Sequence, residues 1–242
     1  MTLKLIYPHD RLGLEPRAMK ARQVWRLAEQ VREQIMQRRP SPCLDVDRLI
    51  RVAKTMVVNG RAIATQWDLE RDVRDEHGCE ALGVTEADPA LPGVVLVSLN
   101  AALIAERDYL KRSTLAHELG HALFDGPSML RQAGKPAFAM VTPDEAHLAT
   151  PRRADGGMDW REFRANEFMG ALLAPRPLLH RQLVRRSIAL GLPLYDAGGG
   201  ELVIRASDDP TRLDELLFDL AERFGVSAAF IEYRLQRYAL VQ

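Results

Sequence analysis

The fold is decided by one stretch, residues 113–123, which reads Ser-Thr-Leu-Ala-His-Glu-Leu-Gly-His-Ala-Leu. His117 and His121 are spaced i, i+4, so on a helix both imidazoles project from one face and can meet at one metal ion. Glu118 is displaced from that face by about 100° of helical rotation, and it can reach a water at the ion without becoming a ligand. The residues around the motif are apolar, and burying two histidines and a glutamate without a metal would be costly. The stretch therefore predicts a metal site on a buried helix.

A catalytic zinc site needs a third protein ligand, and the next helical pattern offers one. Glu162 and Asn166 are spaced i, i+4, so the Glu162 carboxylate can bind the metal while the Asn166 amide oxygen accepts a hydrogen bond from a ligand histidine. Glu167 is the alternative ligand, but it lies on a different face of the same helix. We therefore expect zinc to be bound by the two histidines and Glu162.

This set of residues predicts metal-assisted peptide hydrolysis, which needs neutral nitrogen donors, a nearby carboxylate and an open coordination position. Glu118 would take a proton from the attacking water and then protonate the leaving amine. The competing hypothesis is a non-catalytic, zinc-containing regulatory or DNA-sensing protein that binds a repressor. A purely structural site needs no general base, so Glu118 favours the enzyme.

The periodicity of the remaining residues predicts an α+β fold. Apolar residues recur at helical spacing over residues 17–37, and a shorter helix is expected from Asp45 to Ala53. Residues 55–100 carry short β-favouring runs between turn residues, which predicts a small mixed sheet whose edge could hold an extended peptide. Toward the C-terminus, two helices flank the turn Gly225-Val226-Ser227 with helix-turn-helix proportions.

The metal-site helix has ends that can be predicted from its residues. Ser113 or Thr114 is expected to cap its start, and Asp125-Gly126-Pro127 is expected to stop it. Residues 126–158 are rich in Gly, Pro and charge, which predicts an irregular loop that is either a lid over the site or disordered. The expected organisation is an N-terminal helical extension at 1–44 and a main domain at 45–242, which closes with a helical subdomain at about 205–242.

Three segments carry a resemblance to a known family. They read Thr-Leu-Ala-His-Glu-Leu-Gly-His at 114–121, Glu-Phe-Arg-Ala-Asn-Glu-Phe at 162–168 and Leu-Leu-Ala-Pro at 172–175. This pattern resembles the ImmA/IrrE family of metallopeptidases, and the resemblance extends over roughly residues 45 to 240. It implies a zincin-like fold with the same metal ligands as above and with Glu118 as general base and acid.

The resemblance also implies a partner. Members of the family commonly cleave a helix-turn-helix transcriptional repressor in stress, phage or defence circuits, so regulated cleavage of one protein partner is the expected activity. Two departures from the family pattern stand out: the stretch between the two zinc segments is longer than usual, and Arg164 stands where an acidic residue is frequent.

Two weaker signals remain open between a functional and a structural interpretation. Cys79 could supply a thiolate as an inhibitory fourth ligand that blocks water, or it could be a small buried hydrophobic residue. Two basic groups, one in the first 40 residues and one later in the chain, could hold nucleic acid as an activating signal, or they could be solvated helix faces. The later group consists of Arg176, Arg181, Arg185 and Arg186.

The composition sets limits on partners and location. Lys plus Arg (33) equals Asp plus Glu (33), so the formal net charge of zero gives no global attraction to nucleic acid or to a membrane surface. The two cysteines have no paired-ligand spacing, which suits a reducing compartment. No apolar run approaches the roughly 20 residues of a membrane span, and no leader-like segment is seen. We expect a cytoplasmic protein with no membrane partner.

Overall fold

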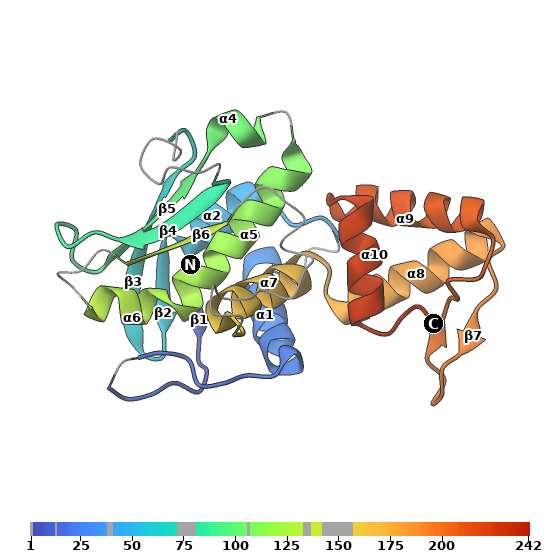
Figure 1. Cartoon of the computed structure of the whole chain (residues 1–242), viewed down its shortest axis with the longest axis horizontal. Helices are drawn as coiled ribbons and strands as arrows, with labels where there is room; N and C mark the ends of the chain where they lie inside the picture. Colours follow the sequence, from blue (N-terminus) through green and yellow to red (C-terminus); the bar gives the residue numbers. More distant parts are fainter. Residues whose placement is uncertain are drawn as a thin grey trace.

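The structure is a computed structural model that describes residues 2–12, 14–37, 41–71, 81–105, 107–132, 137–141 and 157–242; for 137–141 it describes the backbone alone. Within these ranges the chain forms mixed α+β structure, with helices packed against one six-stranded sheet (Figure 1). The predicted α+β class is thereby confirmed. None of the described helices is long and apolar enough to cross a bilayer.

The strands of the sheet are β1 (Leu3–Leu5), β2 (Thr55–Val58), β3 (Arg61–Asp68), β4 (Gly83–Ala87), β5 (Val94–Leu99) and β6 (Ala137–Val141). Their order is β1-β2-β3-β5-β4-β6. β1 pairs parallel with β2 and β3 pairs parallel with β5, while the other neighbours are antiparallel. The mixed sheet predicted within 55–100 is therefore present, and β1 and β6 extend it from outside that range.

The helices are α1 (Ala21–Met36), α2 (Val46–Ala53), α4 (Ala101–Ile104), α5 (Asp108–Phe124), α6 (Gly126–Arg131), α7 (Trp160–Leu173), α8 (Arg176–Leu190), α9 (Pro210–Phe224) and α10 (Ala228–Arg237). A short hairpin of β7 (Tyr195–Asp196) and β8 (Leu202–Val203) follows α8. The helices predicted at 17–37 and from Asp45 are present as α1 and α2, and Asp45 caps α2 by accepting from the Arg48 N–H. α8 was not predicted.

The predicted start of the metal-site helix was wrong. α5 begins at Asp108, and Ser113 and Thr114 lie inside it. Their hydroxyls donate to the carbonyls of Tyr109 and Leu110 one turn earlier. Ser and Thr favour helix starts, but inside a helix they can make this backward bond instead.

The prediction of an irregular loop over 126–158 was also wrong for the parts of that range that the structure describes. Gly126 and Pro127 open α6, because proline is accepted in the first helical turn, where its missing N–H is not needed. Residues 137–141 form β6, which pairs with β4 in an antiparallel register. β4 is therefore paired on both sides, and the described sheet ends at β1 and β6.

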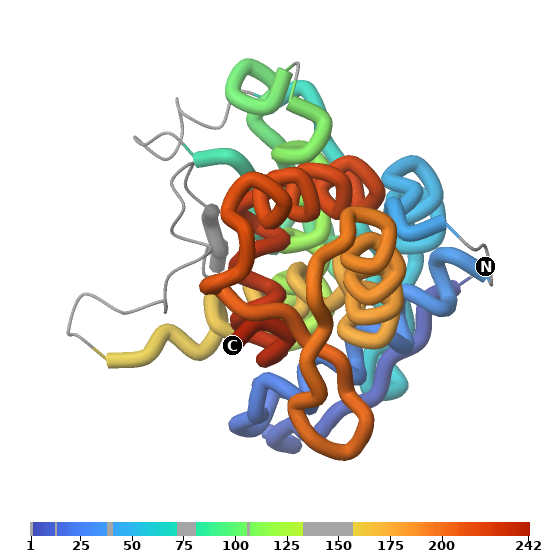
Figure 2. Tube along the Cα trace, turned by 90° about the vertical axis from the view of Figure 1, so that its right-hand side faces the viewer, coloured from blue at the N-terminus to red at the C-terminus, as the bar shows by residue number. Residues whose placement is uncertain are grey.

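Both ends of the chain pack on the central helices. β1 joins the sheet, α1 contacts α7, and the Tyr7 hydroxyl donates to the carbonyl of Leu123 at the end of α5. The C-terminal helices α8, α9 and α10 gather at one end of the molecule (Figures 1 and 2). β1 and α1 thus share the core with the rest of the described chain, while the domain boundaries at 44 and 205 stay predictions.

Candidate metal centre

The candidate site lies where α5 meets α7. His117 and His121 are on α5, and Glu162 is in the first turn of α7. Asp159 caps α7 by accepting from the N–H of Glu162, which fixes where that turn begins. Gly120 permits the close approach of the two helices, because a Cβ there would lie 3.1 Å from the Cα of Ala165.

The three predicted ligands are brought together. His117 Nε2 and His121 Nε2 lie 3.0 Å apart. Glu162 places Oε2 3.3 Å from His117 Nε2 and Oε1 3.2 Å from His121 Nε2. This group could hold a metal ion. Both imidazoles are buried, whereas the Glu162 side chain is 26% exposed, so the group opens to solvent on the Glu162 side.

Negative charge dominates around the histidines. Burial alone would lower the pKa of His121, but Glu162 and Asp125 raise it well above its ordinary value. Burial alone would raise the pKa of Glu162, but His121 and His117 lower it well below its ordinary range. The Glu162 carboxylate therefore stays ionised beside the two imidazoles, and its negative charge favours a cation bound between them.

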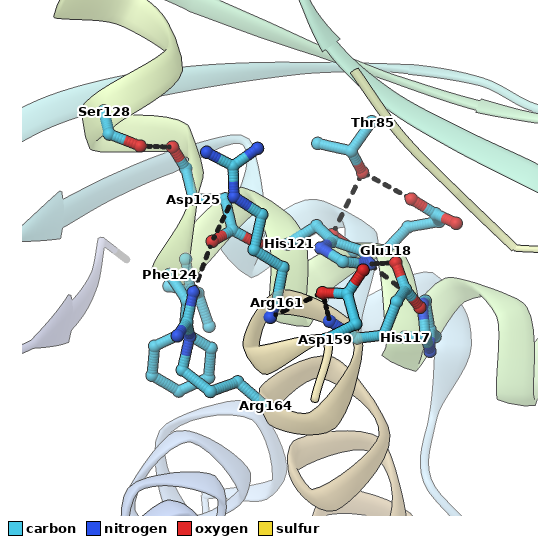
Figure 3. Close-up of polar contacts among 12 residues, drawn as sticks. Thr85, His117, Glu118, His121, Phe124, Asp125, Ser128, Asp159, Arg161 and Arg164 are labelled. Atoms are coloured by element: carbon cyan, nitrogen blue, oxygen red, sulfur yellow. Dashed lines mark hydrogen bonds and ion pairs between the residues drawn. The ribbon is translucent and has the colours of Figure 1, made fainter. Parts of the chain in front are cut away.

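A chain of polar contacts holds His121 from behind (Figure 3). Its Nδ1 lies 2.8 Å from Asp125 Oδ2, and Arg164 donates to Asp125 Oδ1 at 2.8 Å. Burial would raise the pKa of Asp125, but these two partners lower it. A carboxylate on one ring nitrogen leaves the other free to face a metal. Arg164, a departure from the family pattern, therefore has a clear partner.

Sequence reasoning missed Asp125 as a partner of His121. It was assigned to the helix end, although its i, i+4 spacing from His121 is a usable signal. The predicted hydrogen bond between Asn166 and a ligand histidine is not found among the described residues, where Asn166 Oδ1 and His117 Nδ1 are both buried without a partner. Asp125, which caps the C-terminal end of α5, provides the histidine contact that was expected from Asn166.

Glu118 is fully buried beside this group. Its Oε2 accepts from the Thr85 hydroxyl of β4 at 2.5 Å, while its Oε1 has no hydrogen-bond partner. Burial raises the pKa of the Glu118 carboxyl. Gly83 allows β4 to lie this close, since a Cβ there would be 2.9 Å from Oε1. Thr85 and Gly83 were missed because only the folded sheet brings them to α5.

The alternative ligand Glu167 lies in a different cluster. It accepts from Trp25 Nε1 at 2.5 Å, from Arg237 Nε at 2.6 Å and from Arg234 Nη1 at 3.3 Å. Both of its carboxylate oxygens are therefore used outside the metal group, to which Glu167 does not belong. Cys79, the predicted inhibitory ligand, lies outside the described residues.

No protein-family model matches the chain, and no curated protein matches it either.

Proposed function

We propose that the chain is a zinc-dependent endopeptidase of the ImmA/IrrE type, with a zincin-like fold. The observation that carries the proposal is that His117 Nε2 and His121 Nε2 lie 3.0 Å apart, while each lies 3.2–3.3 Å from a different carboxylate oxygen of Glu162. Atoms bonded at about 2.0–2.1 Å to one tetrahedral zinc ion lie about 3.3 Å from one another. The three side chains therefore fit zinc with little rearrangement.

The number of ligands favours a catalytic site over a structural one. Structural zinc sites have four protein ligands, whereas catalytic sites have three and keep a position open. The described part of the chain offers three ligands in this group, and the exposed side of Glu162 provides access. The buried Glu118 Oε1, which has no hydrogen-bond partner, is a feature that a structural site would not need.

The chain's own residues supply the proton transfers of hydrolysis. When bound, zinc acts as a Lewis acid toward a peptide carbonyl. Glu118 Oε1 takes one proton from water as the water oxygen bonds to the carbonyl carbon, and it then delivers that proton to the amine nitrogen as the C–N bond breaks. Thr85 holds Oε2, which leaves Oε1 as the acceptor. The products are one new carboxyl group and one new amine.

The substrate follows from the resemblance. We propose a helix-turn-helix repressor as the protein that is cleaved, in a stress, phage or defence circuit. The alternative, a zinc-containing regulatory or DNA-sensing protein that binds such a repressor without cutting it, would use the same ligands but would not need Glu118.

The test is Glu118→Gln, assayed with a helix-turn-helix repressor encoded beside this chain's gene. Zinc content by elemental analysis should stay near that of the wild type, because Glu118 is not a ligand, and cleavage followed by mass spectrometry should be lost. Glu222→Gln, an exposed change on α9, is the matched control and should cleave normally. Cleavage by Glu118→Gln at the wild-type rate would overturn the role of Glu118, whereas repressor binding without cleavage by the wild type would support the non-catalytic alternative.

A further inference from the structure

A second site lies away from the metal group, between the N-terminal and C-terminal helices. It is a pocket of about 450 Å³, and none of the metal-group residues lines it. Arginines from three helices form its walls: Arg22 and Arg26 on α1, Arg176 on α8 and Arg237 on α10. Arg22 and Arg26 belong to the basic group of the first 40 residues and Arg176 to the later group, and the fold brings both groups to one pocket.

The positive charge of these walls is only partly neutralised. Arg176 pairs with Glu201 at 2.6 Å, and Arg237 pairs with Glu167 at 2.6 Å. Among the residues that the structure describes, Arg22 and Arg26 form no ion pair. Guanidinium groups that face a concave surface without a partner attract anions.

One carboxylate, that of Glu29, also lines the pocket. It is half-buried, and burial and Glu33 raise its pKa, while Arg176 and Arg26 act in the opposite direction. A single carboxylate does not offset four guanidiniums, two of which have no ion pair. The pocket therefore keeps a net positive charge.

The aromatic wall of the pocket has a further arginine behind it. The rings of Trp25 and Tyr238 line the pocket and meet edge to face at 4.8 Å. Arg234 is 1% exposed, and its Cζ lies 4.3 Å from the Tyr238 ring centre. Its Nε and Nη2 are buried without a partner. Arg234 shares the Glu167 carboxylate with Arg237, so these three groups together keep one positive charge beside the pocket.

We propose that this pocket binds a small phosphate-bearing ligand of the nucleoside-polyphosphate class. The planar guanidinium fork matches phosphate oxygens in pairs, and the volume falls within the ordinary range for small-ligand pockets. Trp25, which is only partly buried, provides an aromatic surface against which a flat base can pack, and the buried Tyr238 ring supports it from behind. The concave shape favours a small ligand over a long nucleic acid strand.

The test is isothermal titration calorimetry of the full chain with ATP, with pyrophosphate and with a single-stranded oligonucleotide at physiological ionic strength. The double variant Arg22→Ala/Arg26→Ala should bind ATP at least about tenfold more weakly, because two charge-assisted contacts are lost. Arg185→Ala is the matched control, since Arg185 is exposed on α8 and does not line the pocket. It should bind ATP like the wild type. Both replaced residues of α1 are exposed, so circular dichroism should show an unchanged fold.

Several other results of these titrations would contradict the proposal. Absence of ATP binding to the wild type, or equal weakening by the Arg185 control, overturns the site. Binding of the oligonucleotide alone overturns the assignment to a small ligand. Pyrophosphate that binds as tightly as ATP overturns the role of the aromatic wall.

Discussion

Both ring nitrogens of His121 contact a carboxylate, whereas only one ring nitrogen of His117 does. Nδ1 contacts Asp125, which Arg164 holds in turn, while Nε2 faces Glu162. His117 faces Glu162 as well, but its Nδ1 is buried without a partner. A carboxylate behind a ligand imidazole fixes its tautomer and its direction, so Asp125 is the positioning residue on which the group depends most.

Replacement of Asp125 tests this dependence. Asp125→Asn should weaken zinc binding by about ten- to a hundredfold, because the amide cannot stabilise the His121 ring as a carboxylate does. The measurement is competition with a coloured zinc chelator, at a temperature where thermal unfolding shows both proteins folded. Asp214→Asn, an exposed change on α9, is the control. Unchanged zinc affinity in Asp125→Asn would show that the hydrogen bond does not position the ligand.

The spacing of residues along the chain was enough to predict some helices and site contacts, but not others. The i, i+4 pattern located the ligand helix because both histidines are set by one helix alone. Thr85 and Gly83 reach Glu118 only through the position of β4 in the sheet, which no local pattern contains. α8 was missed because its apolar residues do not form a clear stripe along one face.

Gly120 sets the distance between the two helices that carry the ligands. In Gly120→Ala the new methyl group would lie 3.1 Å from the Cα of Ala165 and 3.3 Å from Cδ1 of Phe168, so α7 must shift. Overpacking of this kind typically costs about 1–3 kcal/mol, and here it also moves Glu162 away from the histidines. We expect lower zinc affinity with unchanged helical content by circular dichroism. Ser113→Ala, on the same helix, is the control. Normal zinc binding in Gly120→Ala would show that the helix spacing is not critical.

At the scale of the whole molecule, the N-terminal and C-terminal helices meet at one buried carboxylate. Trp25 of α1 and Arg234 and Arg237 of α10 all donate to Glu167 of α7. Gly170 makes room for this contact, because a Cβ there would lie 2.4 Å from Arg234 Nη1. Glu167 therefore links three helices that are distant in the sequence, and two of its partners, Trp25 and Arg237, also line the pocket between the N-terminal and C-terminal helices.

Glu167→Gln separates this linking role from metal binding. The change leaves the buried Arg234 without its anionic partner, and loss of one member of a buried ion pair typically costs about 3–5 kcal/mol. Thermal unfolding of the metal-free variant should therefore begin at a clearly lower temperature than in the wild type. Glu215→Gln, exposed on α9, should not shift the transition. Zinc stoichiometry should be unchanged, because Glu167 is not in the metal group. A variant that lost zinc but kept the wild-type transition would instead make Glu167 the third ligand and displace Glu162 from that role.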